Sequence, residues 1–326
     1  LFSFFFLFVL GIFFSFASTS SLAGERLNKD YYFFFSKHIT FASLSILLML
    51  AISFLDIKLI KKSIIPIFFI LLILLILVPF FGIEVKGSKR WLSAYFFRFQ
   101  PIEFIKPFFI LIVAHILSME ESRTSNKSYI ASFIILLFLS IFLVNQPDIG
   151  QTILLVGTWI AIVFISGISI TYIISFFLIS LILIFLLLIT FPIKFGYIIS
   201  RLKTFLDPSK GDSFQSQKAL DAIKQGGFTG QGMGEGILKD YVPEAHTDYI
   251  IAIITEEFGS VVSIILIGIF LYISFRIIKI TLDENDKYIK ISLCGLSSIL
   301  IFQTFIHIGV NTGLLPTTGM TLPFLS

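Results

Sequence analysis

The stretch SIIPIFFILLILLILVPFF, residues 63–81, decides the fold class of this chain. It contains no charged side chain, and a helix of about 20 apolar residues is long enough to cross the roughly 30 Å hydrocarbon core of a bilayer. Similar apolar runs occupy residues 1–18, 39–56, 102–118, 129–145, 149–168, 170–191, 249–275 and 291–310. We therefore expect an all-α, polytopic integral membrane protein with nine visible spans.

The composition agrees with this fold class. Hydrophobic residues make up 56% of the chain, 41 residues are Phe, and only 13% are charged, which excludes an ordinary soluble protein. The net charge of +4 suits contact with anionic lipid or phosphate, and no pattern indicates a nucleic-acid module. The single cysteine, Cys294, excludes an internal disulfide. We expect one membrane domain over residues 1–326, and a tenth span beyond residue 326.

The connection between two of the runs, residues 192–247, is long enough to hold a function or helices of its own. Lys and Arg in the short loops favour a cytoplasmic N-terminus, which places residues 192–247 and the loop 82–101 outside. We expect a helix near 213–225 that ends at Gly226, followed by a glycine-rich run over 226–236. No strand precedes this run and no Gly-Lys-Ser/Thr follows it, so we do not expect a phosphate-binding P-loop. Flexible backbone in an extramembrane turn is favoured over backbone that approaches a ligand closely.

Basic and aromatic residues gather in the two outer loops. The long loop carries Arg201 and Lys203, and the loop 82–101 carries Lys89, Arg90 and Trp91. One interpretation is an aromatic belt with basic anchors at the membrane surface. The other is a phosphate site for a lipid headgroup, in which Arg grips phosphate oxygens in pairs and Trp lies along the lipid or sugar.

The stretch VPEAHTDYIIAIITEEFG, residues 242–259, brings acidic residues to the start of an apolar helix. We expect the helix to begin at Thr247 or Asp248, so that Asp248 lies at the water boundary and either complements the helix dipole or serves a function. Glu256 and Glu257 lie deeper along the helix, and we expect them to be structural. His246 has no accompanying Ser or Cys nucleophile pattern.

Other polar residues interrupt the apolar runs. Glu103 and Lys106 are three residues apart on one helix, and we expect them to neutralise each other. Asp148 is either a buried helix cap or part of a polar cavity. A polar stripe at near-helical spacing, of a kind that commonly joins membrane helices, consists of Gln303, His307 and Asn311.

Six motifs, in order along most of the chain, resemble the SEDS family (shape, elongation, division and sporulation): GSKRWL, FQPIEFIK, QPDIGQT, FLDP, VPEAHTDYIIAIITEEFG and GLLPTTGMTLPFLS. The resemblance implies a helical bundle of ten spans, a large extracytoplasmic loop, and polymerisation of lipid II into glycan strands. It implies that Asp248 is catalytic. The residues expected to bind substrate are Lys89, Arg90, Trp91, Arg201, Lys203, Asp240, Glu244 and His246.

The chain departs from the family pattern at three points. Asp240 stands where relatives commonly have Glu, and Ile102 replaces the usual Ser before Glu103. The chain also stops before the Tyr-Gly-Gly-Ser-Ser that usually follows the last motif. Ala245 makes the PEAHTD stretch resemble the division branch of the family more than the elongation branch.

The implied chemistry needs one base, because the 4-hydroxyl of one lipid II sugar attacks the anomeric carbon of another with inversion. Polyprenyl pyrophosphate leaves readily once its charge is neutralised, so a second catalytic acid is unnecessary. Asp248 is assigned to the hydroxyl, and Arg90 and Arg201, joined by Lys89 or Lys203, to the pyrophosphate. A divalent cation, Mg²⁺ or Mn²⁺, would share that load, although no metal-ligand spacing is visible.

The resemblance further implies a class B penicillin-binding transpeptidase as partner, together with other division proteins of the membrane. It places the chain in the bacterial inner membrane, at the division septum. Two other functions remain open. A lipid II flippase or transporter would use the charges within the spans, and a non-catalytic scaffold would tolerate loss of Asp248.

Overall fold

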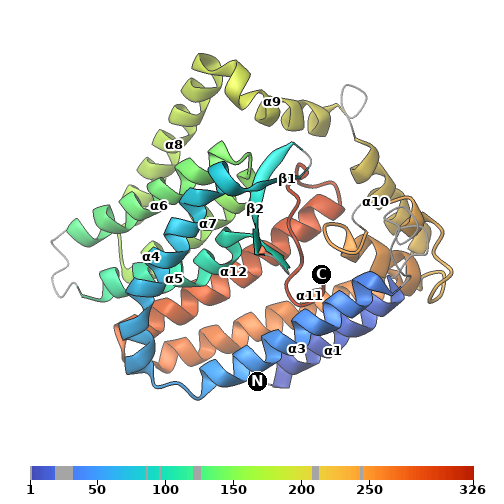
Figure 1. Cartoon of the computed structure of the whole chain (residues 1–326), viewed down its shortest axis with the longest axis horizontal. Coiled ribbons are helices and arrows are strands. Elements are labelled where there is room, and N and C mark those ends of the chain that lie inside the picture. Colours follow the sequence, from blue (N-terminus) through green and yellow to red (C-terminus); the bar gives the residue numbers. More distant parts are fainter. Residues whose placement is uncertain are drawn as a thin grey trace. The chain divides into compact units, whose positions relative to one another are not determined.

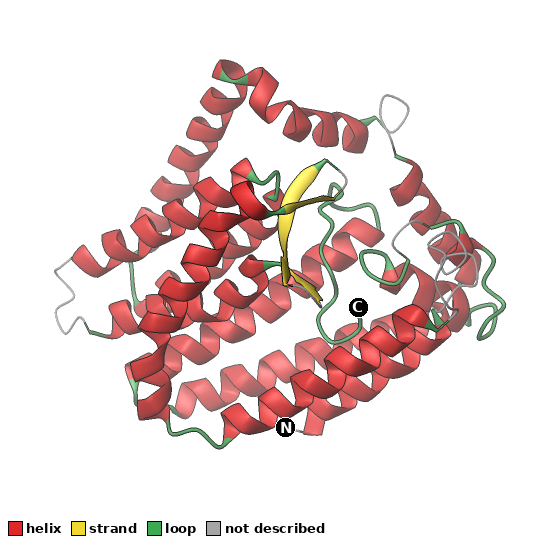
Figure 2. Cartoon of the chain, viewed as in Figure 1, coloured by secondary structure: helices red, strands yellow, loops and turns green. Residues whose placement is uncertain are grey.

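The computed structural model describes residues 2–18, 32–85, 87–94, 97–119, 126–207, 213–242 and 245–326. Helices dominate them (Figure 2). The helices that coincide with the nine predicted apolar runs are α1 (Phe2–Ala17), α3 (Phe33–Ser53), α4 (Ile57–Phe81), α5 (Pro101–Ser118), α6 (Lys127–Asn145), α7 (Ile149–Ser166), α8 (Ile170–Thr190), α11 (Ile250–Asp283) and α12 (Lys287–Asn311) (Figure 1). Among the described residues, seven helices are long and apolar enough to cross a membrane, and Phe2–Ala17 and Ile170–Ile182 form shorter apolar helices. The polytopic helical fold class is confirmed.

The chain divides into two compact units that are each assembled from separate segments. Unit 1 comprises Leu1–Phe54, Ile193–Ile273 and Gln303–Ser326. Unit 2 comprises Leu55–Pro192 and Ser274–Phe302. Helices α11 and α12 therefore each contribute to both units. A single domain over residues 1–326 stays a prediction.

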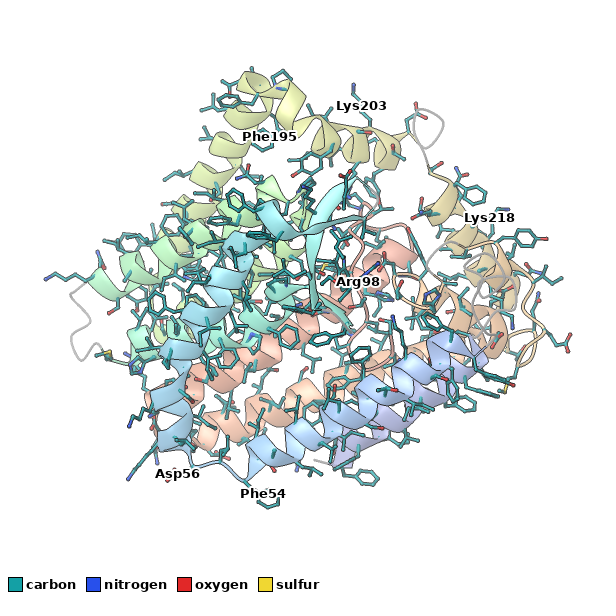
Figure 3. All side chains as sticks on the ribbon, viewed as in Figure 1. Phe54, Asp56, Arg98, Phe195, Lys203 and Lys218 are labelled. Atoms are coloured by element: carbon teal, nitrogen blue, oxygen red, sulfur yellow. The ribbon has the colours of Figure 1, made fainter. Side chains whose placement is uncertain are left out.

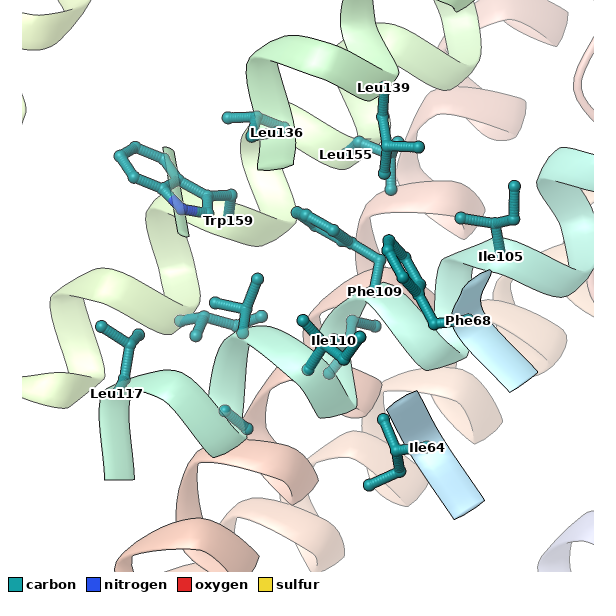
Figure 4. Close-up of a cluster of buried hydrophobic side chains, with 14 of the residues drawn as sticks. Ile64, Phe68, Ile105, Phe109, Ile110, Leu117, Leu136, Leu139, Leu155 and Trp159 are labelled. Carbon is teal, nitrogen blue, oxygen red and sulfur yellow. The ribbon is translucent and has the colours of Figure 1, made fainter. Parts of the chain in front are cut away.

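Unit 2 has an apolar core between α4, α5, α6 and α7 (Figure 4). Phe109 of α5 lies at its centre with no exposed surface, and Leu155 and Trp159 of α7 pack in the same cluster. Local signals set the helix ends: Asp56 caps α4 by accepting a hydrogen bond from the backbone N–H of Lys58, and Gly167 ends α7 in the left-handed conformation.

A small antiparallel sheet in unit 2 was not predicted. It consists of β1 (Ile83–Val85), β2 (Ser88–Ala94) and β3 (Phe97–Phe99), in the order β1-β2-β3. Gly87 turns the chain between β1 and β2 with φ +74°. Along β2 the side chains alternate: Lys89 and Trp91 are exposed, whereas Leu92 is buried. Neighbouring residues of a strand point to opposite faces of the sheet, but the stretch SKRWLSA has no alternation of apolar and polar residues that would have predicted the strand.

Unit 1 contains most of the long loop, which holds helices of its own as predicted. They are α9 (Pro192–Leu206), α10 (Phe214–Gly226) and the short 3-10 helix η2 (Leu238–Asp240). Helix α10 ends at Gly226, as predicted. Helices α1 and α3 pack against each other in the same unit (Figure 1). Helix α11 is interrupted at Gly259, where φ is 84° and ψ is 166°.

Candidate functional site

Asp248 lies in a turn over residues 245–249, directly before α11. The helix begins at Ile250, two residues later than the latest predicted start. On either side of Asp248, Ala245 and Tyr249 are buried, whereas Asp248 is half-buried. The carbonyl oxygen of Asp248 accepts a hydrogen bond from Asn311 Nδ2 at 3.0 Å. The backbone of Asp248 is therefore held in place in a residue that is half-buried.

Arg201 of α9 contacts a segment of unit 1 that also lies beside Asp248. Its Nη1 donates a hydrogen bond to the carbonyl of Thr317 at 3.2 Å. Burial raises the pKa of the nearby Tyr249 phenol to about 12; the negative charge of Asp248 adds to this increase, and the positive charge of Arg201 opposes it. Arg201 and Asp248 also meet the same stretch of chain, because Arg201 bonds the carbonyl of Thr317 and Oδ2 of Asp248 lies beside Gly319. Unit 1 thus brings together one carboxylate and one guanidinium.

Residues 317–321, here called the C-terminal segment, lie beside Asp248. A Cβ atom placed on Gly319 would lie 3.4 Å from Oδ2 of Asp248. The carbonyl of Met320 contacts Nδ1 of His307 at 2.8 Å, and the carbonyl of Thr321 accepts from Gln303 Nε2 at 3.0 Å. The polar stripe on α12 thus binds a non-helical segment and the carbonyl of Asp248. We expected the stripe to join α12 to other helices, but these three carbonyl partners lie outside helices.

The glycine-rich run packs against the break in α11. The backbone N–H groups of Gln231 and Gly232 donate to the carbonyls of Glu256 and Glu257 at 2.9 and 3.0 Å. Gly230 and Gly259 face each other so closely that neither position has room for a Cβ. The run thus replaces hydrogen bonds that the interrupted helix cannot make. The favoured interpretation, flexible backbone, was wrong, and the close approach is to this protein's own helix.

Glu256 and Glu257 are structural, as predicted. Both are buried, and Glu256 Oε1 accepts from the backbone N–H of Leu238 at 2.7 Å. Glu257 Oε1 pairs with Lys239 Nζ at 2.7 Å. Lys239, which is 8% exposed, also donates to the carbonyl of Gly234. These contacts attach η2, and with it the chain leading to Asp248, to the first part of α11.

The three substrate-binding candidates on β2 do not share one face. Lys89 is exposed and lies opposite Glu84 on β1, and Trp91 is 37% exposed and lies opposite Ile83. Arg90, between them, points the other way and is half-buried. Only Lys89 and Trp91 are presented outward by the strand.

Arg90 is engaged within unit 2. Its Nε donates to the carbonyl of Gln146 at 3.1 Å, and its Nη2 donates to the carbonyl of Pro147. Its Nη1 lies 3.8 Å from Oδ1 of Asp148, whose Oδ2 also accepts from Gln100 Nε2 at 2.9 Å. Burial raises the pKa of Asp148, and the Arg90 guanidinium opposes that shift. Asp148 is buried at the N-cap position of α7, as one of its two predicted roles required, but its carboxylate contacts Gln100 and Arg90 and makes no capping hydrogen bond.

The predicted pair of Glu103 and Lys106 is confirmed. Lys106 Nζ lies 2.6 Å from Glu103 Oε2, and Glu103 Oε1 also accepts from Gln151 Nε2 at 2.6 Å. Glu103 lies in the first turn of α5, and Gln151 lies near the start of α7. These charges are therefore paired near helix ends.

The remaining candidates fall into different places. Lys203 is exposed near the end of α9, the helix that also carries Phe195 (Figure 3). His246 is half-buried in the same turn as Asp248. Asp240 is the last residue of η2, and Glu244 lies outside the described residues. Their predicted roles in substrate binding stay predictions.

The described residues do not support a metal site built from protein ligands. Within those ranges, no three or more His, Cys, Asp or Glu side chains are grouped so that they could hold a metal ion. Among the described side chains, the carboxylate placed beside Gly319 is that of Asp248. We therefore assign no step of the chemistry to a protein-bound metal.

Sequence reasoning missed three contributors to the site: Tyr249, Thr317 and Gly319. The signal for the last two was the stretch PTTGM, in which a glycine follows two hydroxyl residues after a proline. Gly319 has φ +65°, a conformation that glycine adopts without strain. The polar stripe on α12 was recognised, but its partners are 13 to 63 residues away in the chain and could not be read from local spacing.

Comparison with known proteins places the chain in context. Residues 1–326 match the family model of the FtsW, RodA and SpoVE proteins, described as cell cycle proteins. A protein of Caulobacter vibrioides named "Probable peptidoglycan glycosyltransferase FtsW" is 33% identical over 318 residues, which cover 97% of this chain and 80% of that protein. Stage V sporulation protein E of Bacillus subtilis is 32% identical over 315 residues, 95% of this chain and 86% of that protein.

Solved structures share the fold. A chain from the structure described as "Structural coordination of polymerization and crosslinking by a peptidoglycan synthase complex" is similar with a TM-score of 0.80 and 23% identity, covering 98% of this chain and 90% of that one. The rod shape determining protein RodA of Thermus thermophilus is similar with a TM-score of 0.69 and 22% identity, covering 98% and 88%. These similarities confirm the polytopic helical fold.

Proposed function

This chain belongs to the FtsW, RodA and SpoVE family of cell cycle proteins, and from that premise we propose that it is a peptidoglycan glycosyltransferase that polymerises lipid II into glycan strands. Relatives that share about a third of its sequence carry the name "Probable peptidoglycan glycosyltransferase FtsW". The observation that carries the proposal is the half-buried Asp248 just before a membrane span, with Gly319 beside its carboxylate and Arg201 bonded to Thr317 of the same segment.

In the proposed reaction, Asp248 accepts the proton of the acceptor's 4-hydroxyl. The hydroxyl oxygen forms a bond to the anomeric carbon of the donor sugar while the bond from that carbon to the phosphate oxygen breaks. The leaving pyrophosphate takes the bonding electrons, and the configuration inverts. A single carboxylate suffices because a pyrophosphate needs charge neutralisation rather than a protonating acid.

Arg201 and Lys203 are the cations that α9 supplies for the pyrophosphate. Lys203 is exposed, so phosphate can reach it. Arg201 is half-buried and already donates one hydrogen bond, to Thr317. A guanidinium presents its N–H donors in a planar fork that matches the oxygens of a phosphate. Mg²⁺ or Mn²⁺ entering with the pyrophosphate stays a prediction.

Lys89 and Trp91 extend the proposal to the sheet of unit 2. Both are exposed on the outward face of β2, where an ammonium can attract phosphate and an indole can lie along a sugar or lipid. Arg90 differs, because its guanidinium contacts two carbonyls and Asp148. We therefore assign Lys89 and Trp91 to the substrate ahead of Arg90.

The position of the charges favours polymerisation over transport. A transporter uses charged groups near the middle of the bilayer. In unit 2, Glu103 lies in the first turn of α5 and is paired with Lys106, and Asp148 precedes α7 and contacts Arg90. These groups neutralise one another close to helix ends. The other alternative is a non-catalytic scaffold. Loss of activity in Asp248 variants would exclude it, and retained function would support it.

The finer biology follows from the division branch that the sequence resembles. We propose a class B penicillin-binding transpeptidase as partner, together with other division proteins, and action at the septum of the inner membrane. In support, one chain of similar fold comes from a peptidoglycan synthase complex. The multi-pass membrane character is supported by the apolar helices themselves.

The proposed function is tested by incubating purified protein and its transpeptidase partner with labelled lipid II and separating the products by length. Strand formation that requires this chain supports the proposal. Movement of lipid II across proteoliposome membranes without strand formation supports the transporter instead. Topology is tested separately with a cysteine at Phe228, which is 79% exposed, in a Cys294→Ser background. If the cysteine is labelled only after the cytoplasmic face of the membrane is made accessible, residues 192–247 lie in the cytoplasm and the proposed topology is wrong.

A further inference from the structure

One face of α12 holds three backbone carbonyls around Asp248. Gln303, His307 and Asn311 are four residues apart, so their side chains lie on one side of the helix. Gln303 donates to the carbonyl of Thr321, His307 Nδ1 contacts that of Met320, and Asn311 donates to that of Asp248. The same helix face therefore fixes both the catalytic residue and the segment beside it.

The contact between His307 and Met320 defines the state of the imidazole. A carbonyl oxygen can only accept, so Nδ1 must carry the hydrogen at 2.8 Å. His307 has no exposed surface. Its Nε2 is buried and has no hydrogen-bond partner among the described residues. The side chain therefore acts in this structure as a donor from Nδ1 toward the C-terminal segment.

The segment that His307 holds connects the two charged groups of the site. The carbonyl of Thr317 accepts from Arg201 at 3.2 Å. Two residues later, Gly319 has φ +65° and its backbone faces Asp248. A Cβ atom added to Gly319 would lie 3.4 Å from Oδ2 of Asp248, which is an ordinary van der Waals distance. Met320, the next residue, is 3% exposed and is the one that His307 contacts. Movement of this segment would therefore alter the surroundings of both Arg201 and Asp248.

We propose that His307 is a positioning residue for glycosyl transfer, which fixes residues 317–320 so that Arg201 and the Asp248 carboxylate keep their productive placement. Asn311 completes the arrangement by holding the backbone of Asp248, and Gly319 leaves the space beside Oδ2 for the acceptor hydroxyl. This inference rests on the proposed function. It assigns His307 no contact with the substrate.

The test compares His307→Leu with His307→Asn in the purified protein and its partner. Asn carries an amide nitrogen attached to Cγ, as Nδ1 is in His, so it keeps a donor in the same place; Leu keeps bulk and has no donor. We expect His307→Leu to lower kcat for strand formation by about tenfold or more, because small misplacements of reacting groups are costly. KM should change by less than about threefold, and His307→Asn should recover most of kcat.

Two results would overturn the inference. The first is a wild-type kcat in His307→Leu. The second is an equal loss of kcat in the Leu and Asn variants at matched amounts of folded protein, since that would indicate a role for the ring other than donation from Nδ1. Failure of the proposed function is a separate result, in which folded wild-type protein with its partner forms no strands from lipid II.

Gly319→Ala tests the role of the C-terminal segment, residues 317–321, without changing a residue of α12. The added methyl would contact Asp248 Oδ2 at 3.4 Å, where the acceptor hydroxyl is expected. Gly167→Ala is the control, because Gly167 has φ +100° and nothing lies within 4 Å of the position that an added methyl would take. We expect Gly319→Ala to reduce kcat per folded molecule by at least about fivefold more than the control. Equal kcat values in the two variants would contradict the inference.

Discussion

Asp148 and Asp248 occupy the same kind of place in the sequence but different environments in the fold. Each stands directly before an apolar helix, in the stretches QPDIGQT and PEAHTDYII. Asp148 is 3% exposed and contacts Gln100 and Arg90. Asp248 is half-buried, with its carbonyl held by Asn311 and its carboxylate beside Gly319. The first residue is enclosed by protein, and the second is half-buried.

An aspartate before an apolar helix can therefore have two roles. Asp148 stabilises unit 2, whereas Asp248 is available for chemistry in unit 1. Enclosure raises the pKa of Asp148, and such a group is stable only with the partners that surround it. A base must instead be reachable by the hydroxyl that it deprotonates. Accessibility, rather than the residue type or its position before a helix, separates the two roles.

The sharpest test of this comparison is Asp248→Asn. General-base catalysis contributes roughly 10²–10⁴-fold, so strand formation should fall at least about a hundredfold while the amount of folded protein and binding of the transpeptidase stay near normal. Asp248→Glu should also be badly impaired, since the carboxylate moves by about a methylene. If Asp248 only complements the helix dipole, the loss would be about 0.3–1 kcal/mol of stability with turnover intact.

Asp148→Ala should produce the opposite pattern. It leaves the guanidinium of Arg90 and the amide of Gln100, which are both half-buried, without this partner. Breaking a buried pair from one side costs about 3–5 kcal/mol, which should appear as a lower thermal unfolding temperature in detergent. Strand formation per folded molecule should stay within about threefold of wild type. A hundredfold loss of turnover without loss of stability would place Asp148 in the chemistry and remove the contrast.

Arg90 sharpens the comparison because the sequence favoured it as a phosphate ligand. Arg90→Lys keeps a positive charge but cannot reproduce the contacts to the carbonyls of Gln146 and Pro147 together. We expect it to lower the free energy of unfolding by about 1–3 kcal/mol and to leave KM for lipid II nearly unchanged. Trp91→Ala is the matched change on the outward face of the same strand, and it should raise KM with little loss of stability. The reverse pattern would restore Arg90 to the substrate.

The smallest effect is expected at an exposed pair in unit 2. Lys61 Nζ lies 3.2 Å from Asp286 Oδ2, and the two side chains are 32% and 43% exposed. Exposed ion pairs contribute about 0–1 kcal/mol, so Lys61→Ala should change the unfolding temperature only slightly and leave strand formation unchanged. A loss as large as that of Asp148→Ala would show that burial is not what separates these pairs.

The sequence by itself determined the properties that depend on short stretches of chain. Nine apolar runs of membrane-spanning length predicted nine helices, and the pattern before Gly226 predicted the end of α10. The pair of Glu103 and Lys106 followed from their spacing on one helix. Such features are local, because helix length, capping and contacts between residues three or four apart are set within a few turns.

Only the tertiary structure decided which distant groups meet. Lys89, Arg90 and Trp91 are adjacent in sequence, yet the unpredicted strand β2 turns Arg90 away from the other two. Asp148 and Asp248 look alike until Arg90 is found beside the first and Gly319 beside the second. These pairings follow from how helices and connecting segments pack, and a polar group's role depends on the partners and exposure that this packing leaves it.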